Sequence, residues 1–277
     1  MQGKRRGIKS YIGEILMLGI CAIFFIPFYY LIVNTFKEAR AATISPMSLP
    51  IKSFTLDLYK KAFDTINFWS SFRNSLLITV ISVTIIIVFG SMAAYVINRH
   101  KNKLTKFLFI YFLIGFMVPA QTTLIPLFNM MSTFKLQNSV LGMIVLYSSW
   151  CNFAIFMYQG FLGGVPRDLE EAARIDGAGL WKMFWHIVFP LLKSVTITII
   201  IFDVMWIWND FMMPYLFISS SSKFTLVMEV YKSVGEHASN WTVMLCTIVI
   251  VLVPITIFYL FMQKHIIAGI TSGAIKG

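Results

Sequence analysis

The sequence predicts an all-α membrane protein with six transmembrane helices. Of its 277 residues, 58% are hydrophobic and only 13% are charged, and the mean hydropathy is +0.76. A soluble domain usually carries about 25% charged residues, so most of this surface must face something other than water. Several apolar runs of about 20 residues can cross a hydrocarbon core about 30 Å thick as helices. They are too long and too evenly apolar to be the strands of a membrane barrel.

The apolar runs divide the chain into a membrane domain with two short ends. We expect one transmembrane domain over 12–262, preceded by an N-terminal segment (1–11) and followed by a tail (263–277). A loop of mixed character, 163–190, separates the fourth span from the fifth. The spans are expected at about 12–34, 72–97, 107–129, 139–162, 190–214 and 241–262.

The loop charges predict that both termini are cytoplasmic. An even number of spans places both ends on one side, and basic residues in short loops mark the cytoplasmic side. The N-terminal segment and the short loop after the second span are rich in lysine and arginine, whereas the loop after the third span has only Lys135. The first loop (about 35–71) is also basic, but it is long and partly acidic, and long loops cross with little regard to charge.

The basic residues and the cysteines predict neither a nucleic-acid partner nor a metal site. The net charge of +11 falls mostly between the apolar runs, where membrane orientation explains it. Cys21, Cys151 and Cys246 lie inside apolar stretches, and the histidines are scattered. No disulfide framework or metal-ligand spacing follows from them.

The third span carries prolines and polar side chains at membrane depth. Pro119 and Pro126 flank a polar stretch that includes Gln121. Such residues are tolerated in a membrane only against protein or a water-filled cavity. We therefore expect this face to point inward, toward a pathway.

The loop 163–190 begins with a short, capped helix. Pro166 suits the first helical position, and Gly177 can take the left-handed conformation that ends a helix. Acidic residues in the first turns favour the positive end of the helix dipole. Glu170 and Arg174 are i,i+4 neighbours in the better orientation for an ion pair.

One face of this helix is expected to admit another backbone closely. Leu169, Ala172 and Ala173 are predicted to share that face, and the two alanines keep it low. A second amphipathic piece, with Leu180, Trp181, Phe184 and Trp185 at helical spacing, leads to Pro190. From the residues alone, a helix lying on the membrane surface explains the segment as well as a protein-docking element does.

The same segment resembles the EAA motif of ABC-importer permeases. Its pattern is Glu-Ala-Ala, three residues, Gly, nine residues, Ile, one residue, Leu-Pro, and phenylalanine replaces the leucine here. The expanded form around Asp176 is similar to the carbohydrate-uptake branch, and further segments along the chain resemble the maltose-type second permease subunit. The matching positions are Glu171, Ala172, Ala173, Gly177, Ile187, Phe189 and Pro190.

This resemblance implies a type I ABC importer permease fold in which the EAA loop is the cytoplasmic coupling helix docked in an ATPase subunit. It implies a bacterial cell-membrane complex of this chain, a second homologous permease, two ATPases and an extracellular solute-binding protein that delivers a sugar. The tail residues Ile275 and Lys276 are expected near the ATPase. The residues expected at the ATPase are Glu170, Glu171, Ala172, Ala173, Asp176, Gly177 and Ala178.

No Gly-x-x-x-x-Gly-Lys phosphate loop occurs in the sequence, so energy must arrive through another chain. We expect no cofactor on this chain, ATP and magnesium on the partner ATPase, and no catalytic residues here. A stiff helix docked in a partner can transmit its rigid-body movement to the spans behind it.

Polar and aromatic residues at membrane depth are the candidates for a sugar pathway, because aromatic faces stack on sugars while amides and carboxylates bind hydroxyls. Polar residues also join transmembrane helices, so each remains open to a purely structural role. A charge at the depth of Asp203 is costly, and this residue either serves function, pairs with Lys193 or stays protonated. The candidates are Gln121, Tyr147, Ser148, Trp150, Asn152, Asp203, Trp208, Asn209 and Asp210.

Two other functions fit the sequence less well. An ion-driven secondary transporter often has midplane acidic pairs and internal repeats, and neither is clear here. An intramembrane enzyme would need a catalytic constellation in the spans, and no Ser/His, Asp/Asp or His-Glu-x-x-His set appears. These residues do not identify the solute of an importer. An importer of the same type for a non-sugar solute is therefore a closer alternative than either of these two functions.

Overall fold

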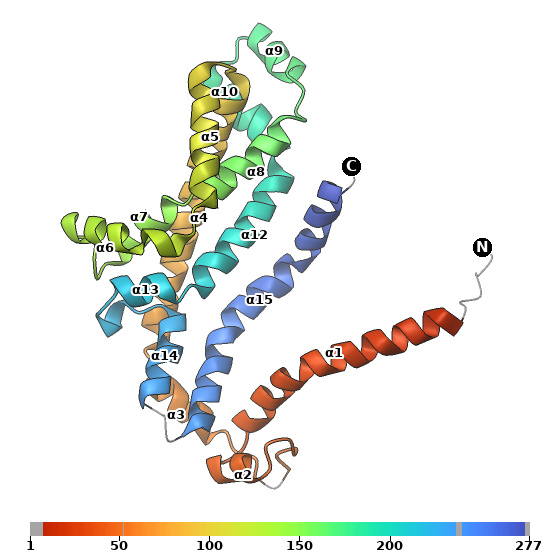
Figure 1. The fold of residues 1–277 in the computed structure, drawn as a ribbon, viewed down its shortest axis with the longest axis vertical. Helices are drawn as coiled ribbons and strands as arrows, with labels where there is room; N and C mark the ends of the chain where they lie inside the picture. Colours follow the sequence, from red (N-terminus) through yellow and green to blue (C-terminus); the bar gives the residue numbers. More distant parts are fainter. Residues whose placement is uncertain (1–7, 52, 237–239, 275–277) are drawn as a thin grey trace. The chain divides into compact units, whose positions relative to one another are not determined.

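The computed structural model describes residues 8–51, 53–236 and 240–274, which are mostly helical (Figure 1). Within these ranges there is no β-strand, although an isolated antiparallel bridge pairs Lys37 with Phe54. The α-helices are α1 (Ile8–Thr35), α2 (Ala39–Ile44), α3 (Asp57–Thr65), α4 (Phe68–Arg99), α5 (Lys103–Met117), α6 (Leu124–Thr133), α7 (Val140–Ser148), α8 (Asn152–Leu162), α9 (Asp168–Ile175), α10 (Leu180–Met183), α11 (Phe189–Leu191), α12 (Lys193–Asn209), α13 (Met212–Phe217), α14 (Leu226–Glu236) and α15 (Trp241–Ala274).

Four helical stretches are long and apolar enough to cross a membrane: Ile12–Thr35, Phe68–Arg99, Val140–Leu162 and Trp241–Lys264. Two further stretches qualify only as bent pairs, Lys103–Met117 with Ala120–Thr133, and Leu180–Leu191 with Lys193–Asn209. The described residues therefore hold up to six spans if each bent pair crosses once. The third and fifth spans differ from the continuous helices that their apolar runs predict.

The third span bends by 97° between α5 and η1 (Ala120–Thr123), a 3₁₀ turn that leads into α6. Val118 ends α5 in an extended conformation (φ −73°, ψ 122°). A residue that precedes proline is pushed out of the helical region by the proline ring, and Pro119 follows directly. The polar stretch after the proline thus lies on a turn rather than on the face of a straight helix.

The fifth span bends by 76° between α11 and α12. It is preceded by η2 (Phe184–Val188), a π-helical segment with wider turns than an α-helix. Pro190 has no N–H to donate to the carbonyl four residues earlier, so the α-helical ladder is interrupted there. Because the π-helical segment and the proline are close together, the segment that leads into α12 is not one straight α-helix.

The chain forms two compact units by its internal contacts. One comprises the residues up to Asn67 together with Glu229–Val253. Its core joins α3 to the first part of α15 through Leu58, Ala62, Val243 and Cys246. Helix α1 contributes little apolar surface to that core, and Phe24 is 71% exposed. An apolar helix that is exposed within its own chain is expected to face lipid or another subunit.

A buried lysine stabilises the segment after α1 in this unit. Lys37 is 1% exposed and its Nζ donates to the carbonyl oxygens of Ser45 (2.8 Å) and Pro46 (3.3 Å). Burial lowers the pKa of the Lys37 ammonium group. The two carbonyl acceptors hold the loop that follows α2 against the end of α1.

The other unit comprises Phe68–Met228 and the residues from Pro254 onward, and α4 is its central helix. Helix α4 packs against α7, α8 and α12 (Figure 1). Gly90 makes the close crossing of α4 and α8 possible, because a Cβ on it would lie 3.1 Å from the Cβ of Ala154. Ala94, one turn later, is fully buried. Small residues at these positions let the two backbones approach closely.

Candidate functional site

The loop after α8 folds into the short helix α9 and a second helical piece made of α10, η2 and α11. Helix α9 ends in a Schellman motif: the N–H of Ala178 donates to the carbonyl of Ala173 (2.9 Å) and that of Gly177 to Arg174 (3.1 Å). Gly177 has φ +79°, the left-handed conformation that its position predicts. The helix begins at Asp168, so Pro166 lies just before it rather than at its first position.

Helix α9 has a buried edge and an exposed outer face. Glu170 (6% exposed) and Ala173 (7% exposed) lie against the same chain. The outer face, made by Glu171, Ala172 and Ile175, is open, and Ile175 is 87% exposed. The prediction that Ala172 and Ala173 share one available face is therefore wrong. Ala173 packs inward because it lies on the same side of α9 as Glu170, and that side faces the rest of the chain.

The remaining residues predicted at the ATPase follow the outer face toward the next helix. Asp176 and Gly177 are exposed, and Ala178 is half-buried. Beyond them, Leu180 and Trp181 are 67% and 66% exposed. A group of exposed apolar side chains on a short, well-capped segment is typical of a surface that another protein or a membrane covers.

The buried edge of α9 is tied to α4 by an ion pair. Nε of Arg99 donates to Oε1 of Glu170 at 2.6 Å, and the Tyr95 hydroxyl donates to Oε2 at 2.8 Å. The guanidinium of Arg99 also donates to the carbonyl oxygens of Leu162 (3.3 Å) and Val165 (3.2 Å). Arg99 thus joins the end of α4 to the end of α8, the connecting loop and α9.

This pair replaces the local one that the sequence predicts. Glu170 bonds to Arg99 rather than to Arg174, which is exposed. Reasoning along one helix finds only neighbours three or four positions away, and Arg99 is 71 residues before Glu170. The one sequence signal was a basic residue at the end of a span, which by itself indicates only membrane orientation.

The second helical piece is anchored by aromatic packing and has an exposed beginning. Met183, Phe184 and Val188 are buried, and the Phe184 ring lies 5.2 Å from that of Tyr95. Leu180 and Trp181 point away from this core. The apolar side chains of this piece therefore form two sets, one packed inward and one exposed.

Three of the predicted pathway residues come together in one hollow. Gln121, Trp150 and Asn152 line a cavity of about 390 Å³ with Trp206, which we call the tryptophan hollow. The Trp150 and Trp206 rings stack with centroids 5.2 Å apart and an interplanar angle of 29°. The hollow offers two aromatic faces and two amide side chains, the mixture that binds sugars in many proteins.

A glycine fixes how closely α5 approaches one wall of the tryptophan hollow. A Cβ on Gly115 would lie 3.0 Å from Nδ2 of Asn152. A side chain at that position would require the Asn152 amide to shift by a few tenths of an ångström. Gly115 thus leaves the space that the Asn152 amide occupies.

Tyr147 and Asp210 form a structural link outside the hollow. The Tyr147 hydroxyl donates to Oδ2 of Asp210 at 2.9 Å. Oδ1 of Asp210 accepts from the N–H of Met212 (2.8 Å), the first residue of α13, so the carboxylate also contacts the start of that helix. The Tyr147 ring contacts Trp150 edge to face at 5.4 Å, which connects this link to the hollow.

The other predicted pathway residues lie elsewhere. Asn209 donates back to the carbonyl of Met205 in its own helix (2.7 Å), and Trp208 is buried against Phe72 at 6.0 Å. Ser148 is half-buried, and its Oγ has no hydrogen-bond partner among the described residues. These three residues do not line the tryptophan hollow.

Asp203 is buried in α12 and is 3% exposed. Among the described residues, its Oδ2 has no hydrogen-bond partner and no ion pair joins it to Lys193. It does not line the tryptophan hollow. In the described part of the chain, Asp203 therefore does not pair with Lys193.

The described residues hold no group of three or more His, Cys, Asp or Glu side chains placed to bind a metal ion. The predicted tail residues Ile275 and Lys276 lie outside the described residues.

Comparison with known proteins identifies similar sequences along the whole chain. Residues 86–271 match the family described as binding-protein-dependent transport system inner membrane component. The multiple sugar-binding transport system permease protein MsmG of Streptococcus mutans is 36% identical, over 96% of this chain and 94% of that one. The probable starch degradation products transport system permease protein AmyC of Thermoanaerobacterium thermosulfurigenes is 33% identical, over 97% of this chain and 98% of that one.

The fold also matches a solved structure. A chain of a bacterial ABC transporter that imports the acidic polysaccharide alginate superimposes with a TM-score of 0.82 at 22% identity, over 95% of this chain and 99% of that chain. At this identity the match establishes the fold, which is that of an ABC importer permease.

Proposed function

The chain belongs to the family of binding-protein-dependent transport system inner membrane components, and on that premise we propose that it forms half of the translocation pathway of a sugar importer. The importer is of the ATP-binding-cassette type. Its solute is a sugar or oligosaccharide delivered by an extracellular solute-binding protein. The names of the relatives support this class of solute, since MsmG and AmyC are named for sugars and starch products.

The division of α9 into two sides is the observation that carries the mechanism. The outer face (Glu171, Ala172 and Ile175) is free to enter a groove of an ATPase subunit. The buried edge is bonded through Glu170 to Arg99 at the end of α4. A movement of the ATPase that displaces α9 is therefore transmitted to a helix of 32 residues that spans the membrane.

The exposed apolar residues Ile175 and Leu180 would suit either a protein groove or a membrane surface, so the charged residues beside them decide between the two roles. Asp168, Glu171 and Asp176 are exposed beside Ile175 and Leu180. A helix that lies on an anionic membrane usually carries a net basic polar face, whereas this segment exposes its three acids together with Arg167, Arg174 and Lys182. A protein groove that places basic residues opposite Glu171 suits this mixed surface better than an anionic membrane does.

The tryptophan hollow is the proposed contact with the sugar. Stacked Trp150 and Trp206 provide apolar faces for the C–H surface of a pyranose ring, and the Gln121 and Asn152 amides lie in the same hollow to bind hydroxyl groups. Tyr147 and Asp210 are positioning residues for Trp150 and for the start of α13. Ser148, Asp203, Trp208 and Asn209 remain candidates for other states of the pathway.

The remaining subunits are assigned by family membership. We infer a second homologous permease, which completes the pathway, and two ATPase subunits that bind ATP and magnesium. This chain has no catalytic role and no cofactor of its own in this proposal. Both termini face the cytoplasm of a bacterial cell, and the tail with Ile275 and Lys276 lies near the ATPase.

Uptake by proteoliposomes tests the proposal. Vesicles that hold this chain, the second permease and the ATPase should accumulate labelled oligosaccharide when ATP and the loaded binding protein are present on their respective sides. Omitting the ATPase should abolish uptake. Uptake by this chain alone, driven by an ion gradient, would instead establish a secondary transporter. Uptake of a non-sugar solute with the same ATP dependence would keep the importer and change the solute.

A further inference from the structure

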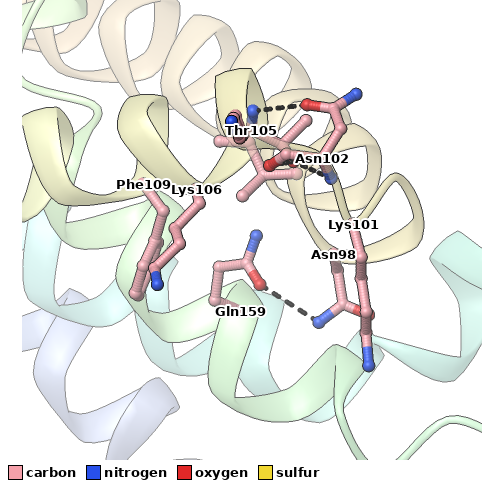
Figure 2. A pocket seen from close by; sticks show the side chains of 9 residues that line it. Asn98, Lys101, Asn102, Thr105, Lys106, Phe109 and Gln159 are labelled. Atoms are coloured by element: carbon pink, nitrogen blue, oxygen red, sulfur yellow. Dashed lines mark hydrogen bonds between the residues drawn. The ribbon is translucent and has the colours of Figure 1, made fainter.

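A second hollow lies away from both the outer face of α9 and the tryptophan hollow. It has a volume of about 770 Å³ and is formed by the end of α4, the start of α5 and the side of α8 (Figure 2). We call it the basic hollow, because Lys101, Lys103 and Lys106 line it. None of its lining residues is acidic.

The three lysines make this hollow a site of positive potential. Their side chains are exposed, and they follow one another over six residues at the junction of α4 and α5. The Glu170 carboxylate is already paired with the nearby Arg99, so it is not directed at these lysines. Cations that share one concave surface repel each other and attract an anion that neutralises them.

Part of the lining of the hollow is a fixed polar surface. Nδ2 of Asn98 donates to Oε1 of Gln159 (3.0 Å), and Nε2 of Gln159 donates to the carbonyl of Ala94 (2.9 Å). Figure 2 shows this amide pair between Lys101 on one side and Lys106 on the other. These hydrogen bonds link α4 to α8. The shape of the hollow between the lysines is therefore fixed by the packing of these two helices.

Apolar side chains complete the lining. Ile97 comes from the last turn of α4, and Phe109 lies beside Lys106 on α5 (Figure 2). The hollow therefore begins where an apolar span ends and basic residues start, which is the depth of lipid headgroups. A soluble anion would use the lysines but would gain nothing from Ile97 and Phe109.

We propose that the basic hollow binds the headgroup of an anionic phospholipid. The phosphate lies among Lys101, Lys103 and Lys106, and the first carbons of the acyl chains lie against Ile97 and Phe109. Basic pockets between transmembrane helices are suited to such headgroups, and each lysine near an anionic lipid strengthens binding by roughly fivefold. The site is independent of the proposed transport function.

Lipid titration of the purified, full-length chain tests this site. Binding of phosphatidylglycerol and of phosphatidylcholine is measured by native mass spectrometry at matched detergent and salt. The triple variant K101Q/K103Q/K106Q should bind phosphatidylglycerol at least about tenfold more weakly. The control K60Q/K61Q/K135Q removes the same charge from exposed positions outside the hollow and should bind as the unchanged chain does.

Three results would overturn the proposal. The first is unchanged phosphatidylglycerol binding by the triple variant, and the second is an equal loss in the control, which would indicate only net charge. The third is displacement of the lipid by inorganic phosphate at equal concentration, which would assign the hollow to a soluble anion. Stronger binding of phosphatidylglycerol than of phosphatidylcholine, lost only in the hollow variant, supports the site.

Discussion

Arg99, the last residue of α4, donates to Glu170 of α9 across 2.6 Å, and their side chains are only 10% and 8% exposed. The hydroxyl of Tyr95 binds the second oxygen of the same carboxylate. The short helix that carries the EAA motif is therefore bonded directly to a span. This contact gives α9 a fixed attachment on one side while its other side stays open.

Replacing Arg99 by glutamine should strongly destabilise the chain, because the Glu170 carboxylate would remain buried without its cation. Breaking a buried ion pair in this way typically costs about 3–5 kcal/mol. The thermal unfolding midpoint of the purified chain in detergent measures this loss. Tyr95→Phe, which removes only the 2.8 Å hydrogen bond, should have a smaller effect.

The double variant R99M/E170M separates stability from coupling. It removes both charges, and replacing a buried pair by apolar residues of similar size is often neutral for stability. We expect its unfolding midpoint to be higher than that of Arg99→Gln, while uptake per ATP hydrolysed in the assembled importer falls. Full uptake by the double variant would show that α4 receives no movement through this pair.

Reversing the charge of Glu171 should weaken association with the ATPase and leave membrane insertion intact. Glu171 is exposed on the outer face of α9, and a like charge opposed to a basic groove is costly in a complex. Copurification of the ATPase with Glu171→Lys should fall by roughly tenfold or more. Asp64→Lys changes the charge equally in α3 and serves as the control. Unchanged association would remove Glu171 from the interface.

Gly142→Ala should destabilise the chain because its Cβ would collide with the carbonyl oxygen of Leu136. Overpacking of this kind typically costs about 1–3 kcal/mol. Gly160→Ala is the matched control, since it lies within α8 and nothing is within 4 Å of its added Cβ. Alanine is the better helix former, so the control should be neutral or slightly stabilising, by about 0.5–1 kcal/mol. Equal unfolding midpoints for the two variants would contradict the close packing at Gly142.

Trp150→Ala and Trp206→Ala should lower oligosaccharide uptake while ATPase association is unchanged. Each variant removes one member of the stacked pair in the tryptophan hollow. The expected effect is roughly three- to tenfold in the solute concentration needed for half-maximal uptake, in line with the energy of one aromatic contact. Trp69→Ala, 70% exposed in α4, is the control. An equal effect of the control would mean that general destabilisation explains the loss.

The sequence predicted the helical class, the apolar spans and the capped helix after the fourth span, because these follow from hydropathy and local backbone rules. It did not predict the Arg99–Glu170 pair, which depends on how α4 and α9 meet in space. Ala172 and Ala173 are adjacent, and only the packing beneath α9 decides which of them is buried. The sequence also did not show which pathway candidates lie together, because that depends on how the helices pack. Gln121, Trp150 and Asn152 line one hollow, whereas Asn209 donates to a carbonyl of its own helix.

Photocrosslinking from the two alanines of α9 tests the docking of this helix most directly. In a background without Cys21, Cys151 and Cys246, the variants Ala172→Cys and Ala173→Cys carry a benzophenone maleimide in the assembled importer. Ala172 is exposed and Ala173 is 7% exposed, so only the Ala172→Cys variant should crosslink to the ATPase subunit. Crosslinking of Ala172→Cys to lipid alone, or equal crosslinking of both variants to the ATPase, would contradict docking through the outer face of α9.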